Sequence, residues 1–69
     1  MGEIKTTTTL KIVQNVSYNF IEIKDFDGLY SVCEQFLTFK DHSSASQYLE
    51  GRLAELRSKG ETVNVQQEA

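Results

Sequence analysis

The sequence predicts an α+β domain of ββααβ order, in which two helices pack on one face of a small antiparallel sheet. Three observations predict this fold. The N-terminal third is rich in threonine, valine, isoleucine and aromatic residues, the middle carries apolar residues at helical spacing, and a short alternating segment follows Gly60. With 69 residues, the chain is expected to form one domain, residues 1–69.

The first expected element is a β-hairpin with strands near residues 5–13 and 18–24. Leu10 and Ile12 alternate with Thr9, Lys11 and Val13 in the first strand, and Ile21 and Ile23 flank a glutamate in the second. This is the two-residue period of a half-buried strand. Two asparagines between the strands favour a turn, and the four threonines at 6–9 are expected on an exposed face.

Two helices are expected next, the first over residues 29–39 and the second over residues 45–59. In the first, apolar residues recur at steps of three and four, which is typical of one helix face. Either Asp25 or Asp27 is expected to cap this helix. The residues that form its apolar face are Leu29, Val32, Cys33, Phe36 and Leu37.

The second helix and the segment after it complete the predicted fold. Ser44 and Gln47 indicate a capping box at the start of the helix, and Gly60 is a natural cap at its end. Residues 62–65 alternate as a short third strand does. The most buried residues are expected to be Leu10, Ile12, Phe36, Leu37, Leu49, Leu53 and Leu56.

The residue types present argue against catalysis. Cys33 is the only cysteine and His42 the only histidine, so an internal disulfide is excluded and a structural zinc site is not expected. Cys33 is expected in the core of the first helix, and His42 in an exposed connector. The glycines are isolated and form no phosphate-binding loop. We therefore expect a non-enzymatic protein, with no cofactor and no metal, that acts by binding.

The net charge of the chain limits the kinds of partner that it can bind. The formal net charge is −3, and an acidic domain repels phosphate. Direct binding of DNA or RNA through Arg52, Arg57 and Lys59 is therefore the least favoured alternative. No stretch approaches the roughly 18 consecutive apolar residues of a membrane span, and the N-terminus lacks a signal-peptide pattern, so a cytoplasmic protein is expected.

Acidic residues gather around the end of the predicted hairpin and the start of the first helix. They are Glu22, Asp25, Asp27 and Glu34. If they are exposed on one side, they form a negative edge suited to a basic protein surface. The alternative is an ordinary solvated face.

Two segments carry a likeness to a known family: Phe26-Asp27 with the residues that follow, and the ending from Gly60 to Ala69. Both resemble small phage-encoded anti-CRISPR proteins that inhibit type I surveillance complexes. Phe26 and Asp27, followed by a segment that contains a tyrosine and a glutamate, resemble a strand-to-helix junction of such a protein, although Gly28 stands where a second acid is expected. The ending of the chain is similar at Gly60, Glu61, Asn64, Val65, Glu68 and Ala69.

The resemblance implies the ββααβ fold and a mode of action. Acidic side chains of such an inhibitor mimic DNA phosphates against the DNA-binding surface of a Cas subunit. Carried over to this chain, Asp27 and Glu34 are the expected contacts, with Asp25 and Glu22 adding charge and Tyr30 beside them.

A second hypothesis of a different class stays open. The small core suggests a structural or regulatory homodimer, in which apolar residues of the second helix are shared between two copies. The residues concerned are Tyr48, Leu49, Leu53 and Leu56.

Overall fold

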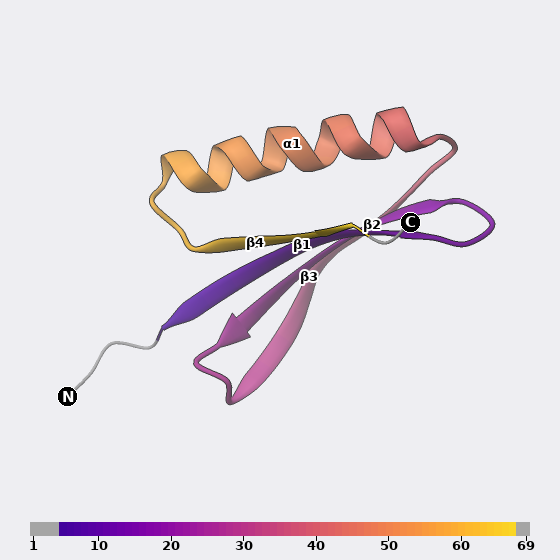
Figure 1. Cartoon of the computed structure of the whole chain (residues 1–69). Helices are drawn as coiled ribbons and strands as arrows, with labels where there is room; N and C mark the ends of the chain where they lie inside the picture. The colour runs from indigo at the N-terminus through magenta and orange to yellow at the C-terminus, as the bar shows by residue number, and fades with distance from the viewer. Residues whose placement is uncertain (1–4, 68–69) are drawn as a thin grey trace.

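The computed structural model describes residues 5–67 as a four-stranded mixed sheet with one helix lying across one face (Figure 1). The elements are β1 (Thr6–Gln14), β2 (Tyr18–Phe26), β3 (Tyr30–Phe39), α1 (His42–Ser58) and β4 (Val63–Gln67). The strand order is β3-β2-β1-β4. β1 pairs antiparallel with β2, β2 pairs antiparallel with β3, and β4 runs parallel to β1. The α+β class is confirmed. The ββααβ order is wrong, because a third strand replaces the first predicted helix, and the antiparallel sheet is wrong, because β4 runs parallel to β1.

The segment predicted as the first helix, residues 29–39, is almost entirely the strand β3. Asp27 and Gly28 have φ values of 58° and 76°, and the N–H of Leu29 donates to the carbonyl oxygen of Phe26 at 2.9 Å. Asp-Gly is a favoured pair for a tight hairpin turn. Asp27 therefore reverses the chain and caps no helix, and hairpin pairing with β2 overrides the helical spacing of the apolar residues.

The N-terminal hairpin is confirmed, with a register that separates the two faces of the sheet. Leu10 lies opposite Glu22, and Ile12 lies opposite Phe20, so these four side chains share the face toward α1. Thr8 lies on the same face and is buried, which differs from the exposed threonine run that was expected. The other face, away from α1, is called the open face below.

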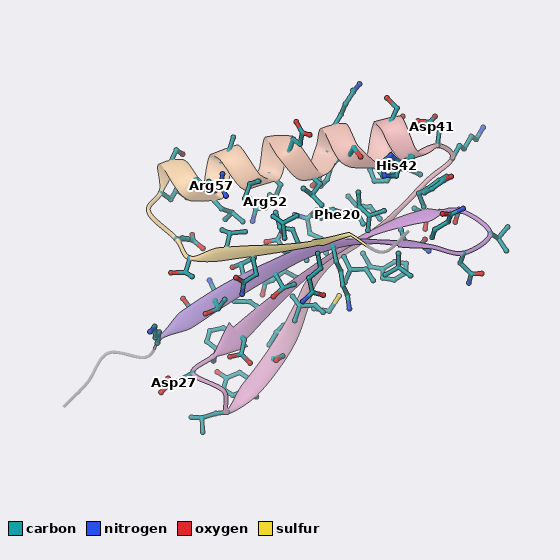
Figure 2. All side chains as sticks on the ribbon, in the orientation of Figure 1. Phe20, Asp27, Asp41, His42, Arg52 and Arg57 are labelled. Carbon is teal, nitrogen blue, oxygen red and sulfur yellow. The ribbon has the colours of Figure 1, made fainter. Side chains whose placement is uncertain are left out.

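The core lies between α1 and the sheet, and Phe20 points into it (Figure 2). The buried apolar residues are Leu10, Ile12, Phe20, Ala45, Leu49 and Leu56. Leu37 and Leu53, which were also expected there, are partly buried. Phe36 is exposed, and so is Cys33. Both were predicted to be buried, and both predictions are wrong because the pairing of β3 with β2 places these side chains on the open face.

The helix begins at His42, earlier than predicted, and Asp41 caps it instead of Ser44. The Asp41 carboxylate accepts the N–H of Ser44 at 2.7 Å. At the other end, Gly60 has a φ of 79°, and its N–H donates to the carbonyl oxygen of Arg57 at 2.9 Å. The predicted glycine cap is confirmed, whereas the exposed His42 belongs to the helix rather than to a connector.

Replacing Asp41 with alanine is expected to lower the melting temperature, while Asp41→Asn should preserve most of it, because asparagine caps about as well. The bond from Ser44 holds the pKa of Asp41 below its ordinary value. A carboxyl group with a lowered folded-state pKa stabilises the fold above its unfolded-state pKa, and this contribution is lost as the pH falls through the folded-state value. The gap in melting temperature between wild type and Asp41→Ala should therefore narrow below about pH 4. Thermal melts across this range check it, and equal melting temperatures at neutral pH would contradict the cap.

Candidate partner-binding surface

Exposed apolar side chains occur on both faces of β3 and on the turn before it, with Tyr30 and Val32 on one face and Phe36 on the other. Leu29 is 79% exposed, Tyr30 58% and Phe36 59%, and Val32 is also exposed. Large apolar side chains that cluster in solvent mark interaction sites. Residues 25–32, which join β2 to β3, are called the hairpin tip below. Figure 2 shows Asp27 at the end of this hairpin, pointing away from α1.

Two aromatic rings stiffen the hairpin tip. Phe26 and Tyr30 lie opposite each other on β2 and β3, and their rings stack with centroids 4.8 Å apart and planes inclined at 19°. The ammonium group of Lys24 lies 5.8 Å from the centroid of the Phe26 ring. Such a stack holds both side chains in one geometry. The hairpin tip therefore offers a preformed apolar surface.

Two aspartates at the hairpin tip have different surroundings. One carboxylate oxygen of Asp25 accepts the N–H of Gly28 at 2.9 Å, and the other accepts the hydroxyl of Ser31 at 2.9 Å. Asp25 thus fixes the turn instead of capping a helix. Asp27 is exposed, and its N–H donates to the carbonyl oxygen of Lys5 at 2.7 Å. Its backbone is therefore anchored while its carboxylate faces solvent.

The other two acids of the expected negative edge lie elsewhere. Glu34 is the extra residue of a β-bulge in β3, since Gln35 pairs with Glu22 and Cys33 pairs with Ile23. It is exposed, but it lies along the strand beyond the hairpin tip. The Glu22 side chain is only 3% exposed and faces α1. Asp25, Asp27 and Tyr30 therefore all lie at the hairpin tip, with Asp25 and Tyr30 on opposite faces of the sheet. Glu34 stands apart, and Glu22 is withdrawn from solvent.

Glu22 is held by a polar network that the sequence analysis missed. Arg52 donates to both of its carboxylate oxygens, from Nε at 2.8 Å and from Nη2 at 3.0 Å. These bonds raise the pKa of Arg52 above its ordinary value. Gln35 donates to Glu22 at 3.4 Å and accepts the hydroxyl of Tyr48. The network ties α1 to β2 and β3.

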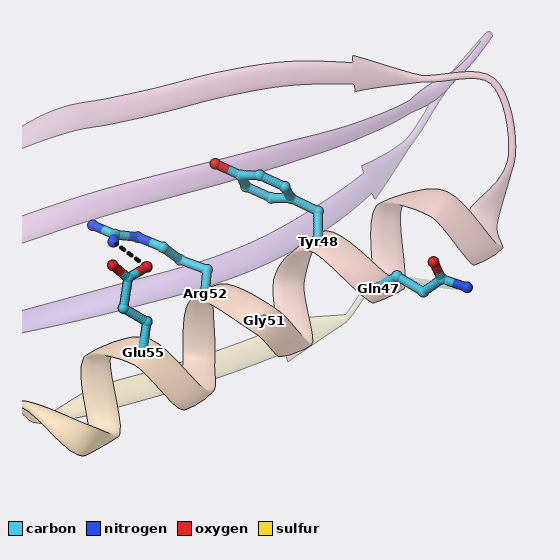
Figure 3. Close-up of a pocket in the computed structure, with 5 residues that line it drawn as sticks. All are labelled: Gln47, Tyr48, Gly51, Arg52 and Glu55. Atoms are coloured by element: carbon cyan, nitrogen blue, oxygen red, sulfur yellow. Dashed lines mark hydrogen bonds and ion pairs between the residues drawn. The ribbon is translucent and has the colours of Figure 1, made fainter.

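The same arginine lines a shallow hollow beside α1, where it also pairs with Glu55 at 3.1 Å (Figure 3). Because the carboxylates of Glu22 and Glu55 already hold the Arg52 guanidinium, this guanidinium is not free to bind an anionic ligand. Since its guanidinium is already paired, Arg52 is also not free to bind nucleic acid together with Arg57 and Lys59. Glu22 and Arg52 are 30 positions apart, so only the crossing of α1 over β2 brings them together.

No family model matches the chain, and neither a curated protein nor a solved structure does so. Within residues 5–67, no three side chains of histidine, cysteine, aspartate or glutamate gather as a metal site requires. The described helix lacks the length and apolar character needed to cross a membrane.

Proposed function

We propose that this chain is a non-enzymatic protein that binds a partner protein through the hairpin tip. The observation that carries this proposal is the clustering of Leu29, Tyr30 and Val32 in solvent beside the stacked Phe26 ring. Aromatic side chains dominate the binding energy of many interfaces. A tip already fixed by its turn and its stacked rings loses little conformational entropy when a partner binds.

Charge at the hairpin tip favours a partner surface with a basic component. Asp27 presents a free carboxylate beside the apolar residues, and an acid at the rim of an interface speeds association and sets register. The exposed Lys5 and the half-buried Lys24 lie on the flanking strand ends. The hairpin tip therefore carries negative charge with two lysines at its flanks, and the apolar contacts supply most of the affinity.

We propose further that the protein is an anti-CRISPR inhibitor from a phage or mobile element. Its partner would be a Cas subunit of a type I surveillance complex, bound at the DNA-binding surface. The exposed Asp27 and the similarity of the C-terminal segment at Gly60, Glu61, Asn64 and Val65 support this proposal. The matches at Glu68 and Ala69 lie outside the described residues. The βββαβ order of the elements differs from the implied ββααβ fold, so the proposal rests on these residues and not on the fold.

Binding to purified type I Cas subunits tests both proposals, the hairpin tip as the contact surface and the anti-CRISPR function. Tyr30→Ala is expected to raise the Kd by roughly tenfold or more, because an aromatic anchor is lost. Asp27→Asn should chiefly slow association and reduce its dependence on salt, and asparagine tolerates the positive φ at this position. Val16→Ser is the matched control, since Val16 is 98% exposed in the β1–β2 turn and should not affect binding.

Each result has a distinct meaning in this experiment. Binding that Tyr30→Ala leaves unchanged would refute the hairpin tip as the contact surface. Failure of the wild type to bind any type I Cas subunit would refute the anti-CRISPR proposal. Equal losses of affinity in Val16→Ser and Tyr30→Ala would mean that the affinity depends on exposed apolar area in general and not on the hairpin tip.

A homodimer that shares the leucines of α1 is not favoured. Leu49 and Leu56 are buried against the sheet of their own chain, and Tyr48 packs edge-on against Phe20 with ring centroids 4.9 Å apart. Sharing these side chains between two copies would require the core to open.

A further inference from the structure

The outer edge of β3 has the properties of a pairing surface. β3 is the first strand in the sheet order, and no other strand of residues 5–67 pairs with its outer side. It is 10 residues long, and Glu34 is its single charged residue. Natural edge strands are commonly short or protected by lysine and proline. The opposite edge, β4, is short at 5 residues, whereas β3 is protected only by the bulge at Glu34.

We propose that β3 pairs antiparallel with β3 of a second copy, with Leu37 opposite its counterpart on the two-fold axis. An antiparallel edge is complementary to itself, so one strand supplies both sides of a symmetric interface. The pairing would join two four-stranded sheets into one continuous sheet. The residues that overlap are 34–40, from the bulge residue Glu34 to Lys40, which directly follows the last residue of β3. They lie outside the hairpin tip.

Charge selects this register. With Leu37 opposite Leu37, the exposed Glu34 of each copy lies opposite the exposed Lys40 of the other, so the dimer contains this pair twice. Opposite charges across a strand pair are stabilising, and like charges directly opposite are destabilising. A shift that brings Glu34 opposite Glu34 is therefore disfavoured.

The same register covers an exposed aromatic ring. Phe36 lies on the open face opposite Ile21 of its own chain and is largely in solvent. In the dimer it lies opposite Thr38 of the second copy and diagonal to the second Phe36. Aromatic side chains reach diagonal neighbours across a strand pair. The interface would thus bury Phe36 from both copies at its centre.

Sedimentation equilibrium from about 10 μM to about 1 mM tests the proposal. The wild type is expected to show a monomer–dimer equilibrium. Glu34→Lys and Lys40→Glu should each raise the dimer Kd roughly tenfold, because two attractive pairs become repulsive. The double variant should return close to the wild-type Kd, because both pairs form again with their signs exchanged. Phe36→Ala should also weaken the dimer.

Asp27→Asn separates this inference from the proposed function, since the hairpin tip lies outside the overlap and this variant should dimerise normally. A wild type that stays monomeric throughout the range would overturn the proposal. A double variant whose dimer Kd stays as high as those of the single variants would also overturn it. Assembly beyond the dimer would do the same.

Discussion

Arg52→Ala is expected to lower the free energy of unfolding by about 3–5 kcal/mol, because it leaves a buried carboxylate without its counter-ion. The Glu22 side chain is 3% exposed, and Arg52 is its only ion-pair partner in the described chain. Water cannot reach Glu22 as it would reach a surface acid. Most of the loss therefore comes from the stranded Glu22 rather than from the Arg52 side chain itself.

Urea denaturation of three variants checks this result. Arg57→Ala is the matched control, because Arg57 is exposed in the last turn of the same helix and its removal should cost under about 1 kcal/mol. A combined Glu22→Leu and Arg52→Leu variant should recover much of the loss, since replacing both partners of a buried pair with apolar residues is often neutral. A change below about 1 kcal/mol for Arg52→Ala would contradict a structural role of the network.

Phe20→Ala should destabilise the protein by about 3–5 kcal/mol, whereas Phe36→Ala should change the monomer's stability by less than about 1 kcal/mol. Phe20 is fully buried beneath α1, while Phe36 lies on the open face of the adjacent strand. A domain of this length is stable by only about 3–10 kcal/mol, so Phe20→Ala removes a large share of the stability and leaves the protein largely unfolded if the wild type lies at the low end of this range.

Circular dichroism melts at low protein concentration measure this contrast. Phe20→Leu serves as a milder variant if Phe20→Ala does not fold, and it should still lower the melting temperature below that of Phe36→Ala. Similar losses at both positions would mean that Phe36 is buried, as the helical prediction for residues 29–39 required.

The parts of the fold that the sequence predicted correctly depend on local signals. The alternation of Leu10 and Ile12 marks the first strand, and Gly60 ends the helix through its own positive φ. β3 was missed because its apolar residues fit steps of three and four as well as a strand does. The Asp27-Gly28 pair, with the aromatic and β-branched residues after it, was the signal that could have shown a hairpin.

The candidate surface was predicted in part. Asp27 and Tyr30 are exposed at the hairpin tip, where an acidic junction was expected, and Asp25 lies at the same tip on the face opposite to Tyr30. The withdrawal of Glu22 could not be predicted, because it depends on Arg52 from a distant helix that crosses β2. Cys33 was predicted to be buried because β3 was predicted to be a helix. The side that a strand residue faces depends instead on its pairing partner.

The parallel pairing of β4 with β1 sets an order of events during folding. The two hairpins connect neighbours in sequence, whereas Thr8 and Val63 are joined across 55 positions (63 minus 8). Local hairpins form within about 1–10 μs, and contacts between distant residues form later because a long loop must first close. Until β4 arrives, the flank of β1 that it occupies stays open, with a threonine-rich, strand-forming sequence. During synthesis or refolding, the open flank of β1 is thus a second edge, besides that of β3, that can capture a neighbouring chain, and the docking of β4 closes it.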